Sequence, residues 1–311
     1  MGCGGKNSEA GYIIVLIHAG VTIFMNYREP LFRPPGEADS LIFQVAYGCP
    51  HNGCRFCAMY KGVRYEVRPE SELLAEIRDA GRFRPETRRI FLADGDVMAL
   101  PFSQLETLLT ALNRSFPELA RVGLYANGSS LAARTPEQLR RLRELKLQTL
   151  YLGLESGDQA LLDRVGKTEN VDNMIAAGQQ AQACGLRLSV MVLLGLAGRR
   201  DSLSHARRTA AALNRMQPRL LSVLRFIAVP GCRMPPDYEP VTEYEAGLEL
   251  RTMVAALDLH KTVFRANHTS NPVPLEARFP ADRTMLLHQL DAILNSGRLD
   301  RSGPGPLPWT L

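Results

Sequence analysis

Short aliphatic runs alternate with stretches of helical period along most of the chain. From Leu41 onward, six runs rich in leucine, isoleucine and valine are separated by segments whose apolar residues recur every three to four positions. A continuous apolar run is typical of a strand buried on both faces, and an amphipathic segment between two such runs is typical of a crossover helix. The pattern therefore predicts repeated βα units around a parallel sheet.

The predicted βα units follow one another along the chain without a break. The predicted strands are 41–45, 89–93, 121–126, 149–154, 187–194 and 221–228, and the predicted helices are 71–80, 102–115, 136–144, 172–184 and 202–216. Thr135 before Pro136 combines a capping side chain with a first-turn proline, which marks one helix start. Six units form either a partial barrel or an open doubly wound sheet, and periodicity does not separate the two.

The two ends of the chain differ from this middle part. After Pro236 the βα rhythm stops, and helices at 243–257 and 283–295 flank a loop at 264–268. The apolar segment from Tyr12 to Met25 is shorter than the ~20 residues that cross a bilayer, so we expect a buried strand or a leader and no membrane partner. No small-residue cleavage site follows it, which disfavours a signal peptide. We therefore divide the chain into an N-terminal extension at 1–40, a core domain at 41–235 and a helical extension at 236–311.

Composition and charge narrow the class of protein. Hydrophobic residues make up 45% of the 311, and 37 Lys and Arg against 32 Asp and Glu give a net charge of +5 without a dense basic block. A surplus this small does not indicate a nucleic-acid partner. Three of the six cysteines lie within nine residues, which is not the spacing of a secreted disulfide framework. The clustering of three cysteines favours a metal site, in a protein that resides in the reducing cytoplasm.

The clustered cysteines carry the strongest chemical signal. Cys49, Cys54 and Cys57 read C-x4-C-x2-C directly after the first predicted strand. Three thiolates can hold three irons of a 4Fe-4S cluster and leave the fourth iron open. An open iron can bind the amino and carboxylate groups of S-adenosylmethionine (SAM), whose reductive cleavage gives a 5′-deoxyadenosyl radical that abstracts hydrogen from a substrate.

Two other uses of the cysteines compete with this interpretation. His51 could complete a zinc site with the three thiolates, although it lies only two positions after Cys49. An electron-transfer ferredoxin would need a fourth cysteine nearby. The alternative function is thus a non-enzymatic iron-sulfur or zinc binding module on a βα scaffold.

Site-like residues also follow the other predicted strands. Parallel βα folds place their chemistry at the carboxyl ends of the strands, which meet at one edge. Polar or glycine-rich segments stand at five such ends: Gly48-Cys49, Asp94-Gly95-Asp96, Asn127-Gly128-Ser129, Glu155-Ser156-Gly157 and Pro230-Gly231.

Together these motifs resemble the radical SAM superfamily, in the branch that includes oxygen-independent coproporphyrinogen oxidases and methylthiotransferases. The resemblance covers roughly 41–230, and Phe56 matches the aromatic residue that precedes the last cysteine. The usual spacing is C-x3-C-x2-C, so the first gap here has one extra residue, and no subfamily follows. The resemblance implies a partial (β/α)6 TIM-like barrel and an enzyme that uses a 4Fe-4S cluster and SAM.

The same resemblance implies roles for single residues. Asp94-Gly95-Asp96 would hold the amino group of SAM, Glu155 would face SAM, and Lys167 or Arg164 would pair with its carboxylate. Asn127 and Ser129 would make weaker polar contacts with SAM. The segments 194–198 and 229–231 would flank its adenine. Without the resemblance, the two aspartates would be read as helix caps and Glu155 as a salt-bridged structural carboxylate.

The substrate is less defined. The chain shows no room for a cobalamin domain, no second set of three cysteines and no added RNA-binding domain, so we expect a small-molecule substrate determined by residues 235–280. The resemblance also implies an external one-electron donor such as flavodoxin or ferredoxin.

Overall fold

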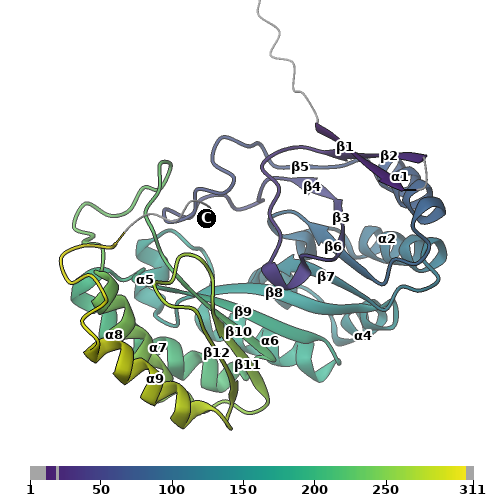
Figure 1. The fold of residues 1–311 in the computed structure, drawn as a ribbon. Coiled ribbons are helices and arrows are strands. Elements are labelled where there is room, and N and C mark those ends of the chain that lie inside the picture. Colours follow the sequence, from purple (N-terminus) through teal and green to yellow (C-terminus); the bar gives the residue numbers. More distant parts are fainter. Residues whose placement is uncertain (1–11, 19–20, 306–311) are drawn as a thin grey trace, which may run out of the picture.

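A curved, mostly parallel sheet organises the protein. A computed structural model describes residues 12–18 and 21–305. Its main sheet has eight strands in the order β12-β11-β10-β9-β8-β7-β6-β3, and all neighbours are parallel except β11 and β12 (Figure 1). Because β3 and β12 are the two edges, the sheet is an open, partial barrel. The expected α/β architecture is confirmed.

The six predicted strands are all present in the sheet. They are β3 (Leu41–Gln44), β6 (Arg89–Ala93), β7 (Arg121–Ala126), β8 (Leu147–Glu155), β9 (Arg187–Leu194) and β10 (Leu220–Arg225). Their leucine, isoleucine and valine side chains are buried against the helices, as in β6, where Ile90 and Leu92 are fully buried. Only the predicted end of the sixth strand is wrong by several residues, because β10 stops at Arg225.

Helices cover the outer face of the sheet (Figure 1). The longer ones are α1 (Glu70–Phe83), α2 (Phe102–Ser115), α4 (Pro136–Glu144), α6 (Val171–Ala183), α7 (Gly198–Met216), α8 (Glu243–Ala256) and α9 (Arg283–Asn295). Two short helices that periodicity did not predict, α3 (Gly128–Ala132) and α5 (Gln159–Arg164), lie directly after β7 and β8. The predicted cap of α4 is confirmed, since the Thr135 hydroxyl accepts a hydrogen bond from the backbone of Gln138.

The C-terminal part continues the sheet, so the expectation that the βα rhythm stops after Pro236 is wrong. After α8 the chain enters β11 (Thr262–Ala266) beside β10, and β12 (Leu275–Phe279) returns antiparallel to it. The segment 264–268, expected as a loop, therefore begins inside a strand. A five-residue strand that contains Arg265 gives too weak an apolar run to be recognised. Both predicted helices of this part are present, and the division of the chain at residue 235 remains a prediction.

The N-terminal part forms two strands rather than a spanning helix. β1 (Tyr12–His18) and β2 (Val21–Tyr27) pair antiparallel, and the Tyr27 hydroxyl donates a 2.7 Å hydrogen bond to the carbonyl of Ile42 in β3. Residues 1–11, to which part of the expected leader belongs, lie outside the described residues. Across 12–18 and 21–305, no helix has the length and apolar character needed to cross a membrane. A second small sheet, β4 (Ala46–Tyr47) with β5 (Glu66–Val67), brackets the segment that carries the three cysteines.

A buried carboxylate fills the inner side of the sheet near the start of β7. The 3-10 helix Pro35–Glu37 places Glu37, which is fully buried, against Tyr151, whose hydroxyl donates a 2.6 Å hydrogen bond to it, and against Arg121 at 3.1 Å. The hydroxyl of Ser40 donates to the same carboxylate. Gly123 leaves the necessary room, because a Cβ there would lie 3.1 Å from Glu37 Oε1. The N-terminal segment is thus attached to the interior of the barrel.

This attachment predicts the effect of neutralising Glu37. In Glu37→Gln the amide cannot balance the charge of Arg121, so we expect the free energy of unfolding to fall by about 2 kcal/mol, measured by urea denaturation. Glu144→Gln removes a carboxylate paired with Arg141 on the exposed surface and should cost less than about 0.5 kcal/mol. Equal stability of the two variants would contradict the role given to Glu37.

Candidate functional site

A large cavity lies at the carboxyl ends of β6, β7 and β8. It has a volume of about 700 Å³ and is lined by the cysteine loop, defined here as residues 48–65, and by the segments that follow those strands. Its polar and ionisable lining residues are Cys49, His51, Asn52, Cys54, Cys57, Tyr60, Asp96, Tyr125, Asn127, Ser129, Ser130, Arg134, Tyr151, Glu155, Lys167, Thr168 and Glu169. Four of the five predicted strand-end segments contribute residues to this lining, and Pro230-Gly231 does not.

Close backbone contacts hold the cysteine loop against this edge. A Cβ on Gly95, just after β6, would lie 2.6 Å from the Cα of Cys49, so the loop can approach only because residue 95 is glycine. The backbone N–H of Arg55 donates to the carbonyl of Val165 at 2.7 Å, and that of Arg233 donates to the carbonyl of Arg55 at 2.7 Å. The loop is therefore fixed by the ends of β6 and α5 and by the segment after β10.

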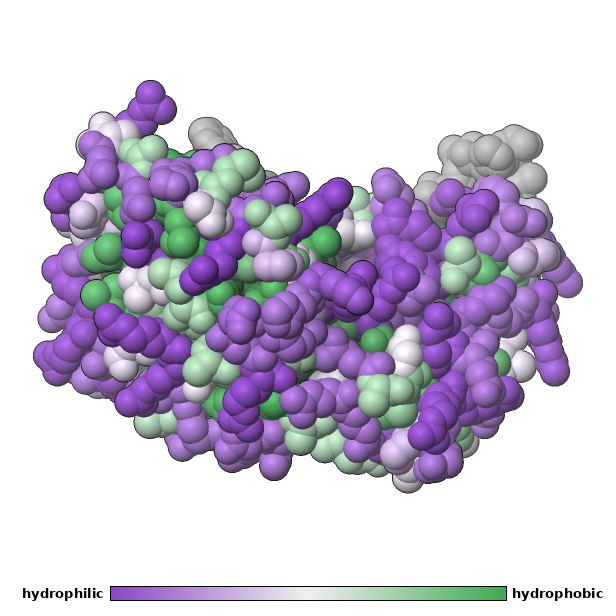
Figure 2. Space-filling model, turned by 90° about the horizontal axis from the view of Figure 1, so that it is seen from below, coloured by the Kyte–Doolittle hydropathy of each residue, from purple (hydrophilic) through white to green (hydrophobic). Residues whose placement is uncertain are grey.

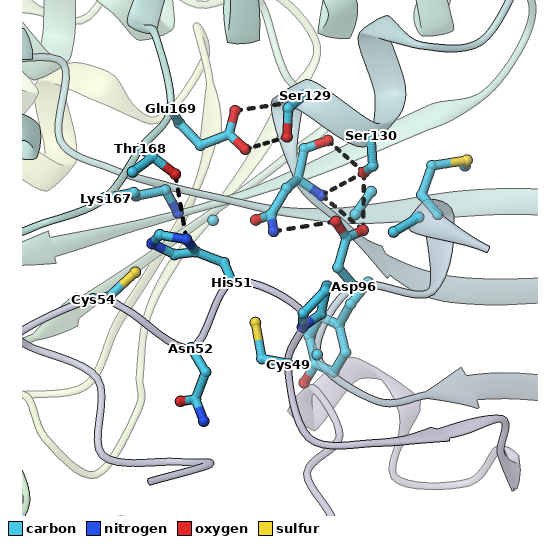
Figure 3. Close-up of a pocket in the computed structure, with 18 of the residues that line it drawn as sticks. Cys49, His51, Asn52, Cys54, Asp96, Ser129, Ser130, Lys167, Thr168 and Glu169 are labelled. Atoms are coloured by element: carbon cyan, nitrogen blue, oxygen red, sulfur yellow. Dashed lines mark hydrogen bonds between the residues drawn. The ribbon is translucent and has the colours of Figure 1, made fainter. Parts of the chain in front are cut away.

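The three cysteines of the loop are free thiols that all line the cavity. The sulfur atoms of Cys49 and Cys54 point toward the side on which Lys167 and Asp96 lie (Figure 3). Burial raises the pKa of Cys54 to about 11, with nearby Lys167 acting in the opposite direction, and burial also raises the pKa of Cys57. Within the described residues no three His, Cys, Asp or Glu side chains already form a metal-ligand shell. Three thiols on one short loop at one cavity nevertheless have the donor chemistry of an iron-sulfur site.

The His51 ring contacts the segment after α5 and does not join the three cysteines in a zinc site. Its Nε2 lies 3.0 Å from the carbonyl of Gly166, and its Nδ1 lies 3.3 Å from the Thr168 hydroxyl. A carbonyl can only accept, so Nε2 donates the hydrogen bond to Gly166. Both ring nitrogens are thus engaged by the segment after α5, and the structure lends no support to His51 as a fourth ligand.

The two aspartates after β6 lie in different surroundings. Asp94 accepts 2.7 Å hydrogen bonds from the Gln44 amide and the Tyr60 hydroxyl and is not among the residues that line the cavity. Burial raises the pKa of Asp94 to about 6, although these donors oppose the shift. Asp96 does line the cavity, and it accepts hydrogen bonds from the backbone of Asn127 at 3.2 Å and from the Ser130 hydroxyl at 2.9 Å.

Neither aspartate caps the following helix, so that alternative is wrong. α2 begins after Pro101 without a side-chain cap. Asp96 precedes the short 3-10 helix Val97–Ala99, but its carboxylate makes no capping hydrogen bond there. Asp94 instead joins the end of β6 to β3 and to the cysteine loop, while Asp96 joins it to the end of β7.

Asn127 and Ser129 belong to a hydrogen-bonded wall of the cavity. Figure 3 labels Ser129, Ser130, Asp96 and Glu169 of this wall. The side-chain amide of Asn127 donates to Asp96 at 3.2 Å. The backbone N–H and the hydroxyl of Ser129 donate to the carboxylate of Glu169 at 2.9 and 2.6 Å. Glu169 lines the cavity and was missed from the sequence, because it follows α5 in a segment without an apolar pattern.

Glu155 and Lys167 form a buried ion pair at the end of β8. Their Oε1 and Nζ atoms lie 3.4 Å apart, and the two residues are 8% and 5% exposed. Glu155 has a left-handed backbone with φ of 61° at an irregularity between β8 and β9. A Cβ on Gly153 would lie 2.2 Å from Glu155 Oε1, so glycine is needed where the carboxylate folds back. Burial raises the pKa of Glu155, and Lys167 acts against that rise.

The remaining predicted residues divide between the cavity and its surroundings. Phe56 is buried between the last two cysteines, lines the cavity and packs with Phe226. Arg164 pairs instead with Asp237 near the surface and is not a lining residue, so of the two predicted basic residues only Lys167 lines the cavity. The segments 194–198 and 229–231 also lie outside the lining. Arg134, which was not predicted, lines it and donates to the carbonyl of Met98 at 2.6 Å.

The buried pair predicts a pH-dependent stability defect. In Lys167→Met, the Glu155 carboxylate loses its cation, and we expect the unfolding free energy at pH 8 to fall by about 3 kcal/mol. A folded-state pKa above the unfolded value means that the protonated form is favoured in the native state, so the defect should shrink as the pH falls toward 5. Adding Glu155→Gln should recover most of the loss. A defect that is constant from pH 5 to 8 in urea denaturation would argue against an uncompensated Glu155.

Comparison with known proteins gives the family. Residues 43–205, just over half of the chain, match the family model described as the radical SAM superfamily. The chain is 26% identical over 150 residues to the heme chaperone HemW of Bacillus subtilis (strain 168), a match that covers 47% of this chain and 38% of that protein. It thus spans less than two thirds of this relative.

Solved structures share the fold at low sequence identity. Methylornithine synthase PylB has a TM-score of 0.52 at 15% identity, covering 81% of this chain and 68% of that one. The FeFe-hydrogenase maturase HydG from Carboxydothermus hydrogenoformans has a TM-score of 0.50 at 20% identity, covering 80% and 56%. With the family match over the strands that build the cavity, the chain belongs to the radical SAM superfamily of enzymes, whose cofactors are a 4Fe-4S cluster and SAM.

Proposed function

We propose that Cys49, Cys54 and Cys57 hold a 4Fe-4S cluster and that the adjoining cavity binds SAM for reductive cleavage. The observation that supports this most is that all three thiols open onto the same cavity as the polar residues after β6, β7 and β8. When bound, the cluster and SAM together supply a 5′-deoxyadenosyl radical that abstracts hydrogen from the substrate. No observation favours the alternative of a non-enzymatic binding module.

The charges around the cavity suit this assignment. Lys167 lies close enough to Cys54 to lower the pKa of its thiol against the effect of burial, so it would favour the thiolate that an iron ligand requires. Glu155, held by the same lysine, presents a carboxylate that can accept a hydrogen bond from an amine or a ribose hydroxyl. A sulfonium cofactor with an ammonium group and a carboxylate would meet charges of both signs here.

The hydrogen-bonded wall would orient the rest of SAM. Asp96 and Gly95 stand next to the cysteine loop, where we place the amino group of SAM. Asn127 and Ser129 are already fixed by Asp96 and Glu169, so their remaining lone pairs and protons have defined directions. Phe56 provides an apolar surface between the thiols. Asp94, with both oxygens bonded outside the cavity, would act by positioning the cysteine loop.

The cavity volume supports a small-molecule substrate. About 700 Å³ falls within the range of roughly 300–1,000 Å³ that small-molecule sites occupy. We propose that substrate binds there beside SAM and that an external one-electron donor, such as a flavodoxin or ferredoxin, reduces the cluster. The reducing cytoplasm is the compartment in which the free thiols of the loop would remain available.

The cysteine assignment predicts a strict dependence on the three thiols. After anaerobic reconstitution with iron and sulfide, wild-type protein should form 5′-deoxyadenosine from SAM and dithionite, and Cys54→Ala should lose this activity because its iron has no ligand. Iron and sulfide content and product formation are the measurements. Cys184→Ala, in the core and bonded to the carbonyl of Pro136, is the matched control and should keep both. Retention of iron-dependent SAM cleavage by Cys54→Ala would remove the basis of the assignment.

The geometry at Gly153 predicts a defect in SAM binding. A methyl group at this position displaces the Glu155 carboxylate, so Gly153→Ala and Glu155→Gln should each raise the KM for SAM about tenfold, the effect of one lost charge-assisted hydrogen bond. Gly303→Ala, at a glycine where an added Cβ would lie 3.4 Å from its nearest neighbour, Oδ2 of Asp300, is the control for a glycine substitution away from the cavity and should leave the KM unchanged. An unchanged KM in both site variants would exclude Glu155 from the SAM contacts.

A further inference from the structure

The inner face of the sheet extends beyond the cavity toward its C-terminal edge. One row of neighbouring residues runs across four adjacent strands of the sheet. It consists of Gly153 in β8, Met191 in β9, Ser222 in β10 and Arg265 in β11. Gly153 and Met191 line the cavity. Since paired residues of parallel strands point to the same side, Arg265 lies on the cavity side of the sheet, two strands away from Met191.

Burial along β11 agrees with this orientation. Thr262, Phe264 and Ala266 are buried, and Phe264 packs against Phe279 beneath the sheet. The alternate residues, Val263 and Arg265, are the more exposed ones and therefore face the opposite, concave side.

Arg265 lacks the partners that a half-buried guanidinium normally has. Its Nε atom is buried without a hydrogen-bond partner, and no ion pair joins it to another described residue. Its cross-strand neighbour Glu276 makes no ion pair with it, and the Glu276 carboxylate accepts a hydrogen bond from Asn267. A buried guanidinium N–H left unpaired costs free energy, which an anion would recover.

The other carboxylates on the concave side are also engaged. Glu37 is bound by Arg121 and Tyr151, and Glu155 is bound by Lys167. Ser222, a small residue, lies between Arg265 and Met191 in the row of paired residues. Arg121 and Lys167 are therefore each paired with a carboxylate, whereas Arg265 forms no ion pair with any of the described residues.

We propose that Arg265 binds an anionic group of the substrate, a carboxylate or a phosphate, while the reacting end of the same molecule lies in the cavity. This inference rests on the proposed function. Two strand spacings of ~4.8 Å separate Met191 from Arg265, so the anionic group lies about 10 Å across the sheet from the cavity wall at Met191. The substrate class is thus a small molecule with its negative charge at one end and an abstractable hydrogen at the other.

The test measures the binding of simple anions to the 311-residue chain without cluster or SAM. Succinate and inorganic phosphate serve as carboxylate and phosphate probes, and neutral succinamide is the uncharged control, each titrated by calorimetry at constant ionic strength. Wild-type protein should bind one of the anions saturably in the millimolar range, and Arg265→Gln should bind it about tenfold more weakly. Arg265→Lys should bind the anion with intermediate affinity, because lysine keeps the positive charge but lacks the planar guanidinium that donates two parallel hydrogen bonds.

Arg114→Gln is the matched control. Arg114 lies in the last turn of α2, away from the concave side of the sheet, and is exposed. Its removal should change binding less than about twofold, and urea midpoints of all variants show whether each one folds. Equal anion binding by wild type and Arg265→Gln, or no anion binding beyond that of succinamide, overturns the proposal. Since this assay requires no SAM cleavage, its failure is separate from a failure of the cysteine assignment.

Discussion

The approach of Gly95 to the backbone of Cys49 determines where the chemistry of this protein lies. Without a side chain at residue 95, the cysteine loop reaches the end of β6 and its thiols open onto the cavity formed with the ends of β7 and β8. The other contacts of the loop, from Asp94 through Tyr60 and from Val165 to Arg55, maintain this position. A short loop thereby acquires the fixed geometry that a metal-binding set requires.

Buried charge is distributed so that the cavity remains polar while the sheet remains stable. The Glu37 carboxylate, held by Tyr151 and Arg121, lies on the inner side of the sheet, and Glu155 is compensated by Lys167 at the strand ends. Polar side chains that line the cavity, such as Asn127, Ser129 and Lys167, form hydrogen bonds or ion pairs with residues of other segments. The surface seen from below is mostly hydrophilic with apolar residues in scattered groups, and it is hollowed along one edge between the two ends of the molecule (Figure 2).

Much of the fold was predictable because parallel strands buried on both faces give strong apolar runs. Strands such as Arg89–Ala93 and helices such as Phe102–Ser115 agree with their predicted limits. β11 was missed because two of its five residues, Val263 and Arg265, face the concave side and interrupt the apolar run. The rule that functional residues follow the strands correctly predicted that Asp96, Asn127 and Glu155 line one cavity. It also selected Asp94, which does not line the cavity and instead bonds Gln44 and Tyr60, two residues distant from it in sequence. Glu169 and Arg134 reach the cavity through tertiary packing that no local pattern encodes.

The hydrogen bond from the Arg233 backbone to the Arg55 carbonyl has a mechanical consequence. The sheet itself is open between β3 and β12, so strand pairing does not couple its first and last strands. This bond, with that of the Cys232 thiol to the Phe56 carbonyl, spans the opening from the segment after β10 to the loop after β3. The two halves of the open barrel are therefore tied together at the backbone between Cys54 and Cys57, and neither can shift without carrying that backbone with it.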